Sequence, residues 1–406
     1  SDVGHCMLFR VVLLVLALVL LAFASLTTVR VPVAVDWRLA LLAGEYGHWL
    51  VALPLGLGAV AWGLRAGAPG WAWVTLVLCL AATGLLLKPS FQAFGLAARL
   101  GERLPATWRD AAPKRPAWSL RTLYLGSTPA PVPAETRTFA PGLALDFFRP
   151  PGQAGPVPCV IVIHGGGWDG GDRGQLPQFN HALAHLGYAV AAISYRLAPA
   201  HRWPAQRDDA LAAIAYLKAH AGELGIDPDR LVLCGRSAGG QIAAAVGYTA
   251  RDPAIRGVVA FYAPFDMHFV WSISRDDDAL NSLKLMTQFL GGPPTPERAA
   301  VFDSASAQAH VHRGETPPTL LVHGEIDTLV WHRHSERLAA RLAEEQVPHG
   351  FLSLPWAVHA LEFNPSGPAG QLTYHAIETF LAATTAARTA PGTPAARNPS
   401  ARGSGD

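Results

Sequence analysis

The chain has 406 residues, 50% of them hydrophobic, and its 32 basic and 30 acidic side chains leave a formal net charge of +2. This near balance provides no electrostatic footprint for nucleic acid, so we expect no nucleic-acid partner. The length allows one catalytic domain of about 250 residues together with a second region.

Three apolar segments fill the first 88 residues, at about 8–29, 46–64 and 71–87. The first is an almost uninterrupted run of Val, Leu and Ala that is long enough to cross a bilayer. The second contains Gly and Pro, which are commoner in membrane helices than in soluble ones. We therefore predict that residues 1–88 form an all-α transmembrane region of three helices in a lipid bilayer. A cleavable signal peptide and a hydrophobic packing domain in water are the alternatives.

The basic residues near the ends of these segments predict an orientation. Arg10 and Arg65 fall on one side of the predicted membrane. Five basic residues fall on the other side, together with the rest of the chain: Arg30, Arg38, Lys88, Arg99 and Arg103. Because cytoplasmic flanks carry the excess of Lys and Arg, this count predicts a multi-pass protein of the cell membrane whose larger region faces the cytoplasm.

Residues 89–136 are predicted to join two regions. Large apolar side chains alternate with Arg and Glu at helical spacing from about 90 to 104, which indicates an amphipathic helix on the membrane surface. The residues that follow, up to 133, are rich in proline and indicate a linker.

Residues 137–386 alternate apolar strands with amphipathic helices, which is typical of a mostly parallel sheet with helices on both faces. Ligands of such α/β folds bind beyond the carboxyl ends of the strands. The last residues, 387–406, are mainly Ala, Pro, Thr, Arg and Gly, and we predict that this tail is disordered.

The segment 231–246 has the order strand, turn, helix, with Gly-x-Ser-x-Gly at the turn. In this context the motif is a nucleophile elbow, in which glycines at 235 and 239 leave room for a strained serine. Ser237 is therefore the predicted nucleophile. The motif alone also occurs as an ordinary strand-to-helix turn.

An earlier strand, 159–163, runs into His164-Gly165-Gly166-Gly167-Trp168. Bare glycine backbone can approach a developing oxyanion closely. We expect an oxyanion hole made by the N–H groups of Gly165, Gly166 and Ala238, the residue after the nucleophile. A flexible glycine turn is the alternative interpretation.

Two further residues follow predicted strands downstream: Asp327 lies just past a buried strand in the segment 319–330, and His359 lies in the loop after the next strand, in 351–360. The chain order Ser, Asp, His is that of an α/β-hydrolase triad. His359 would take the proton of Ser237, and Asp327 would hold the imidazole in the required tautomer.

Residues 265–296 break the alternation of strands and helices and are rich in large apolar side chains. We predict a cap over the substrate pocket, with ordinary packing as the alternative. Phe265 and Trp271 in this cap, and Trp168 after the glycines, are the predicted substrate contacts.

These motifs, with Ser194-Tyr195-Arg196-Leu197-Ala198-Pro199 and Trp203-Pro204-Ala205, give a resemblance over about 137–383. The chain resembles the hormone-sensitive-lipase-like branch of the α/β-hydrolases, close to the acetyl-esterase and feruloyl-esterase-like group. The resemblance implies a serine carboxylesterase that needs no cofactor and no metal. One departure concerns Arg236, since many members have an acidic residue there, and it bears on substrate preference.

Together these features predict a membrane-anchored serine carboxylesterase that acts on esters, including amphiphilic ones, through an acyl-enzyme. Acyl transfer by the same triad is the alternative within enzymes. A membrane interaction module without activity is the alternative from another class. The sequence leaves the natural ester, its acyl length and the oligomeric state open.

Overall fold

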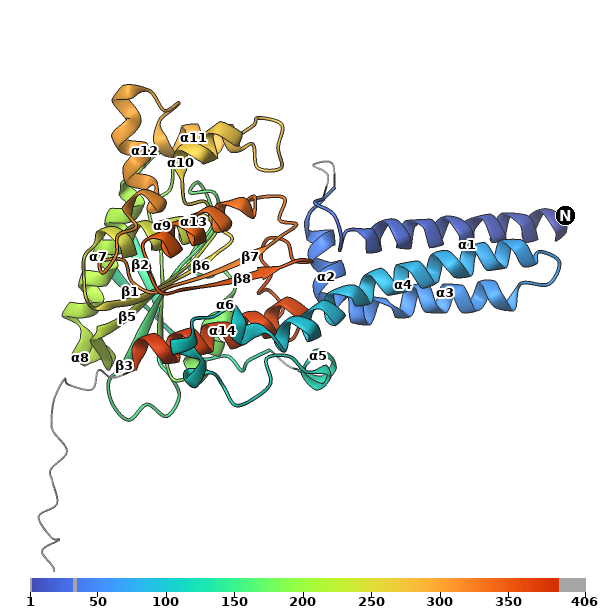
Figure 1. Ribbon diagram of the computed structural model, residues 1–406, viewed down its shortest axis with the longest axis horizontal. Helices are drawn as coiled ribbons and strands as arrows, with labels where there is room; N and C mark the ends of the chain where they lie inside the picture. Colours follow the sequence, from blue (N-terminus) through green and yellow to red (C-terminus); the bar gives the residue numbers. More distant parts are fainter. Residues whose placement is uncertain (1, 32–34, 127, 387–406) are drawn as a thin grey trace, which may run out of the picture.

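The computed structural model describes residues 2–31, 35–126 and 128–386. A rod of apolar helices projects from an α/β body (Figure 1). The tail that the sequence predicts to be disordered, 387–406, lies outside the described residues.

The rod is built from four helices where the sequence predicted three. They are α1 (Asp2–Ser25), α2 (Arg38–Leu50), α3 (Ala52–Gly63) and α4 (Pro69–Ala97). Helices α1, α3 and α4 lie side by side, whereas α2 lies at the junction with the α/β body (Figure 1). The predicted segment 46–64 is divided at Val51, because Pro54 has no N–H to donate to the Leu50 carbonyl and the helical hydrogen bonding is interrupted there.

Helix α4 changes the prediction for residues 89–136. It is one helix of 29 residues that continues through Pro89, so the predicted surface helix is in part its last turns. Two 3-10 helices follow, η1 (Leu100–Glu102) and η2 (Ala106–Ala111), and then α5 (Leu120–Leu125). Leu104 and Trp108 are buried, and the Trp108 ring lies 5.0 Å from that of Phe380. Part of the predicted linker, at Trp108, is therefore packed into the core of the α/β body.

The α/β body contains an eight-stranded sheet in the order β1-β2-β4-β3-β5-β6-β7-β8. Among the described strands, the pairs β1–β2 and β2–β4 are antiparallel and the other five pairs are parallel, so the sheet is mostly parallel, as predicted. The strands are β1 (Ala134–Ala140), β2 (Leu143–Phe148), β3 (Val157–Ile163), β4 (Ala189–Ile193), β5 (Ile226–Arg236), β6 (Ile255–Phe261), β7 (Thr319–Gly324) and β8 (His349–Leu354).

Helices cover both faces of this sheet (Figure 1). The central strands are continuous apolar runs because both of their faces are buried. Ile161 and Leu233 pack into the core under α7 (Ala205–Ala219), α9 (Ala238–Thr249) and α13 (Arg333–Glu344). Val160 and Val232 pack into the core under α6 (Pro177–His185) and α14 (Pro368–Thr385). The helices of the body are α6 (Pro177–His185), α7 (Ala205–Ala219), α8 (Ala221–Leu224), α9 (Ala238–Thr249), α10 (Met267–Ile273), α11 (Ser282–Leu290), α12 (Ala299–Ala305), α13 (Arg333–Glu344) and α14 (Pro368–Thr385), with 3-10 helices η3 (Pro296–Arg298) and η4 (Ala307–His310).

Glu45 joins the helical rod to the α/β body. Its side chain projects from α2, is 1% exposed, and accepts a hydrogen bond of 3.1 Å from the N–H of Ala369 in the first turn of α14. Burial raises the pKa of Glu45 to about 8, against the opposing effect of its hydrogen bonds to the α14 backbone, and the charge of Glu362 raises it further. The folded junction therefore favours the protonated carboxyl.

Replacing Glu45 with glutamine should make the junction less sensitive to alkaline pH. A raised carboxyl pKa contributes stability that is complete below the ordinary value of 4.5 and is lost as pH rises through about 8. The wild type should lose on the order of a few kcal/mol between about pH 4.5 and about pH 8, whereas Glu45→Gln should lose less. Thermal unfolding across this range measures the difference, and parallel curves would contradict the assignment.

Candidate active site

Ser237 lies at a sharp turn between β5 and α9, with φ 51° and ψ −119°. This is a strained conformation for a residue that carries a side chain. A Cβ atom at Gly235 would lie 2.0 Å from the Gly239 carbonyl oxygen, and one at Gly239 would lie 2.2 Å from that of Ile163. Only glycine fits at both positions, so the turn has the geometry of the nucleophile elbow.

Asp327 and His359 follow neighbouring parallel strands, β7 and β8, and meet at the same edge of the sheet. His359 Nδ1 lies 2.7 Å from Asp327 Oδ2. The other carboxylate oxygen accepts hydrogen bonds from the N–H groups of Leu329 and Val330, at 2.8 and 3.0 Å. Although burial opposes it, the neighbouring imidazoles of His359 and His323 hold the pKa of Asp327 below its ordinary value. The aspartate is therefore an ionised, fixed acceptor for the histidine.

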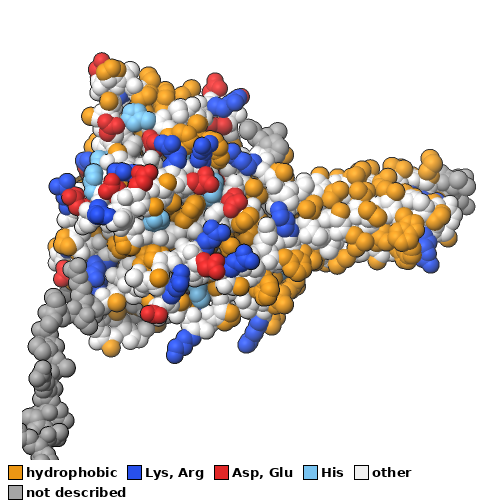
Figure 2. Space-filling model, viewed as in Figure 1, with side chains coloured by type: hydrophobic (Ala, Val, Ile, Leu, Met, Phe, Trp, Pro, Cys, Tyr) orange, Lys and Arg blue, Asp and Glu red, His pale blue; other side chains and the backbone are white. Residues whose placement is uncertain are grey.

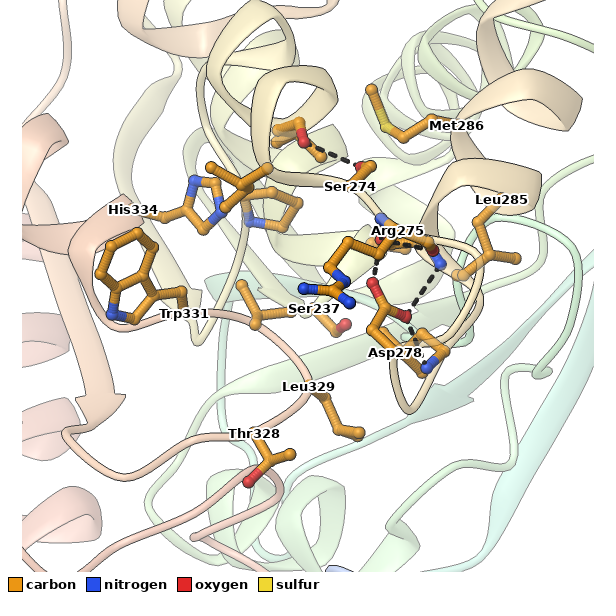
Figure 3. A pocket seen from close by; sticks show the side chains of 18 of the residues that line it. Ser237, Ser274, Arg275, Asp278, Leu285, Met286, Thr328, Leu329, Trp331 and His334 are labelled. Atoms are coloured by element: carbon orange, nitrogen blue, oxygen red, sulfur yellow. Dashed lines mark hydrogen bonds between the residues drawn. The ribbon is translucent and has the colours of Figure 1, made fainter. Parts of the chain in front are cut away.

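Two cavities meet at the nucleophile, and Ser237 lines both. One, of about 540 Å³, is also lined by His359, so the three predicted catalytic residues are brought together. The other, of about 340 Å³, is shown in Figure 3. Both cavities are lined mainly by apolar surface, and the smaller one, which Trp168 and Leu285 help to line, is called the apolar cavity below. Burial lowers the pKa of His334, in the wall of this apolar cavity, to about 3, so the imidazole is neutral there at neutral pH.

In the glycine loop after β3, the structure differs from the prediction for one oxyanion donor, Gly165. The N–H of Gly165 donates to Gln175 Oε1 at 2.8 Å and is therefore occupied. Gly166 and Gly167 have φ of 125° and 61° and line the cavity beside Ser237. A Cβ atom at Gly166 would lie 2.3 Å from the Gly170 carbonyl oxygen, which explains why glycine is needed. All three glycines line this cavity, and no sequence pattern shows which of their N–H groups is taken by Gln175.

The predicted substrate contacts have different outcomes. Trp168 lines the apolar cavity, and its ring stacks on Phe289 at 4.2 Å. Phe265 is fully buried in the core, and the Trp271 ring packs near Phe302 at 6.1 Å. Neither residue lines either cavity, so those two predictions are not supported.

Helices α10 and α11, which fall in the predicted cap segment 265–296, lie beside the apolar cavity, where Figure 3 shows Leu285 and Met286. Their contact residues are Val270 and Ile273 from α10 and Leu285 and Met286 from α11. Val270 and Ile273 are three residues apart and share one face of α10, whereas Trp271 lies on another side of that helix and packs near Phe302.

The segment between α1 and α2 supplies a part of the site that the sequence did not reveal. Arg30 lines the apolar cavity, and its Nε donates to the Asp327 carbonyl oxygen at 3.2 Å. Trp37 lines the larger cavity, and its ring lies edge-on to the His359 imidazole, with centroids 6.0 Å apart. The helical rod therefore contributes walls to both cavities.

The parallel sheet, the elbow and the Asp327–His359 pair define the region from β1 to α14 as an α/β-hydrolase. Residues 145–342 match the family model BD-FAE.

Comparisons with known proteins relate the chain to carboxylic ester hydrolases. It is 31% identical over 255 residues to "Probable carboxylic ester hydrolase LipM" of Mycobacterium tuberculosis, covering 59% of this chain and 57% of the relative. It is 30% identical over 240 residues to "Esterase LipC" of the same organism, covering 56% and 58%. The chain thus spans less than two thirds of the length of these relatives. The solved "Bacterial Heroin Esterase" has a TM-score of 0.56 and 28% identity, over 63% of this chain and 85% of that one.

Proposed function

We propose that this protein is a serine carboxylesterase anchored in a membrane. The observation that carries the proposal is the hydrogen bond of 2.7 Å between Asp327 and His359, with His359 in the cavity that the elbow serine lines. Ser237 Oγ attacks the ester carbonyl and gives its proton to His359 Nε2, while Asp327 stabilises the imidazolium. The N–H groups of Gly166, Gly167 and Ala238 are the proposed donors to the oxyanion.

The proton that His359 must deliver decides which cavity holds the alcohol part of the ester and which holds the acyl part. The leaving alcohol accepts this proton, so the alcohol part of the ester belongs in the larger cavity, which His359 lines. The acyl part then belongs in the apolar cavity, with Trp168 and the cap helices around it. Water enters after the alcohol leaves, His359 deprotonates it, and the acyl-enzyme is hydrolysed to the acid and free Ser237.

Labelling with a fluorophosphonate, followed by assays with p-nitrophenyl esters of increasing acyl length, tests this function. We expect a covalent adduct on Ser237 and release of p-nitrophenol with an optimum at acyl chains that the apolar cavity holds. An adduct without hydrolysis would point to transfer of the acyl group to an alcohol. A protein that neither reacts nor hydrolyses any ester would refute the proposal.

The exposed apolar surface of the helical rod supports the membrane part of the proposal. Two helices, His5–Ser25 and Pro69–Ala97, are long and apolar enough to cross a membrane. Only 11% and 28% of their most apolar windows are buried, unlike the core helix of a soluble protein. Figure 2 shows hydrophobic side chains along the rod. Exposed residues of this kind are Val11, Val15, Val19, Leu53, Leu55, Val60, Val74, Val77 and Leu80. A bilayer is the medium that would cover them.

We further propose that the hydrolase faces the cytoplasm, because most Lys and Arg near the helix ends lie on its side. Protease added to intact cells should then leave the hydrolase uncut, whereas protease added to permeabilised cells should digest it. An epitope in the exposed loop at Asp276 would report either result. Cleavage in intact cells would show that the hydrolase faces the opposite side of the membrane, and it would not affect the proposed chemistry.

A further inference from the structure

A buried ion pair links the nucleophile turn to the loop of the catalytic base. Arg236 Nε donates to Glu362 Oε1 at 2.7 Å, and the two side chains are 2% and 0% exposed. Arg236 directly precedes Ser237, and Glu362 follows His359 by three residues. The ion pair therefore joins the residues that carry the nucleophile and the base, which follow β5 and β8 and are separated in the sheet by β6 and β7.

Tyr262, just after β6, joins this pair to the imidazole itself. Its hydroxyl donates to the same oxygen, Glu362 Oε1, at 2.7 Å. Its ring lies 4.1 Å from the His359 ring. The backbone of Tyr262 is held at φ 35°, a conformation that a tyrosine adopts only where surrounding contacts enforce it. Burial, and then the charge of Glu362, raise the pKa of Tyr262 well above its ordinary value, so the hydroxyl stays a donor.

The arrangement is poorly suited to stability alone. Within the described part of the chain, both terminal nitrogens of Arg236 and Glu362 Oε2 have no hydrogen-bond partner. The guanidinium carbon lies 4.5 Å from the centre of the Phe179 ring, which compensates in part. Buried ion pairs with incomplete hydrogen bonding are commonly no more stable than apolar residues of the same volume. If the ion pair serves to hold two segments of the chain in fixed relative positions, the presence of charged side chains at these buried positions is explained.

We propose that Arg236, Glu362 and Tyr262 are positioning residues that form a brace between the nucleophile turn and the loop of the base, fixing His359 relative to Ser237. This inference rests on the proposed ester hydrolysis. Proton transfer needs the serine oxygen and the imidazole nitrogen within hydrogen-bond distance, and a displacement of about 1 Å can cost about 10²-fold in rate. Arg236 and Tyr262 also line the larger cavity, but the proton transfers depend on the relative positions of Ser237 and His359. The expected signature is therefore a loss in kcat that exceeds any change in KM.

The mildest test compares two tyrosine variants with a short p-nitrophenyl ester. Tyr262→Phe removes only the hydroxyl and should lower kcat about 10-fold with KM unchanged within about twofold. Tyr248→Phe is the matched control, because Tyr248 is also buried and its hydroxyl lies 2.9 Å from Thr319 Oγ1, away from both cavities. The control should lose stability without losing kcat. Equal kcat values in the two variants would overturn the brace.

A second comparison separates positioning from folding. Glu362→Gln leaves Arg236 buried without its counter-charge, so we expect a lower melting temperature and a kcat reduced about 10²-fold. The double variant Arg236→Met with Glu362→Leu restores an apolar core and should recover the melting temperature while kcat stays low. If kcat recovers together with stability, the brace is only structural and the proposal is wrong. A wild type without esterase activity would instead refute the proposed function, and the brace with it.

Discussion

Replacing Ser237 with alanine should lower the turnover of a short soluble ester by about 10⁶-fold, as removal of a triad nucleophile does elsewhere. The turn is enforced by backbone contacts of Gly235 and Gly239, and alanine has a smaller side chain than serine, so the fold should persist. Steady-state kinetics with p-nitrophenyl acetate measure the loss. Unchanged circular dichroism and melting temperature would show that the loss is chemical.

The matched control is Ser272→Ala. Ser272 is an exposed serine of α10 whose hydroxyl donates to the Phe269 carbonyl at 2.8 Å, and it lines neither cavity. This variant should keep turnover within about twofold, in line with the small effects of most surface substitutions. Full activity in Ser237→Ala would reject the nucleophile and, with it, the proposed mechanism.

Replacing Asp327 with asparagine should lower turnover by about 10⁴-fold. The carboxylate accepts from His359 on one oxygen and from the Leu329 and Val330 N–H groups on the other. An asparagine keeps its single acceptor oxygen toward those two N–H groups and presents an NH₂ group to His359. The imidazole must then accept at Nδ1 and carry its proton at Nε2, where it can no longer receive the serine proton.

Asp303→Asn provides the control for this second prediction. Asp303 precedes β7, whereas Asp327 follows it, and the exposed carboxylate of Asp303 pairs with His268, at 2.9 Å, and not with a residue of either cavity. We expect turnover within about twofold of the wild type, since exposed pairs contribute little. If Asp303→Asn were inactive and Asp327→Asn active, the acid would have to be reassigned.

The sequence predicts the elbow well because its constraint is local. Gly235, Ser237 and Gly239 lie within five residues, and the steric need for glycine acts between neighbouring turns of one strand-turn-helix unit. Asp327 and His359 are predicted by a topological rule instead, since the carboxyl ends of parallel strands share an edge. The glycine pattern and the position after a parallel strand can both be recognised in the sequence without knowledge of tertiary packing.

Other parts of the site depend on packing that no local pattern encodes. The Gly165 N–H donates its hydrogen bond to Gln175, ten residues further along the chain, and three consecutive glycines look alike in sequence. Trp271 is as large and apolar as a pocket residue, but the direction of one short helix turns it toward Phe302. Proline content indicated a linker at 105–133, whereas tertiary contacts of Trp108 place part of that segment in the core.

The roles of Arg30 and Trp37 in the site could not be predicted from the sequence, because they too depend on tertiary packing. The hydrogen bond from Arg30 to Asp327 spans 297 positions and joins two regions that the sequence treats as separate. Glu362 had no motif of its own, although its charge is opposite to that of the unusual Arg236. Such a complementary pair is a signal that could have been sought.

The contribution of Arg30 and Trp37 makes the helical rod more than a tether. Exchanging it for unrelated helices would remove one wall from each cavity while leaving Ser237 and its partners in place. For the protein engineer, the join between the helical rod and the α/β body is thus a place to tune ester selectivity, and we expect a chimera made there to take its preferences from both parents.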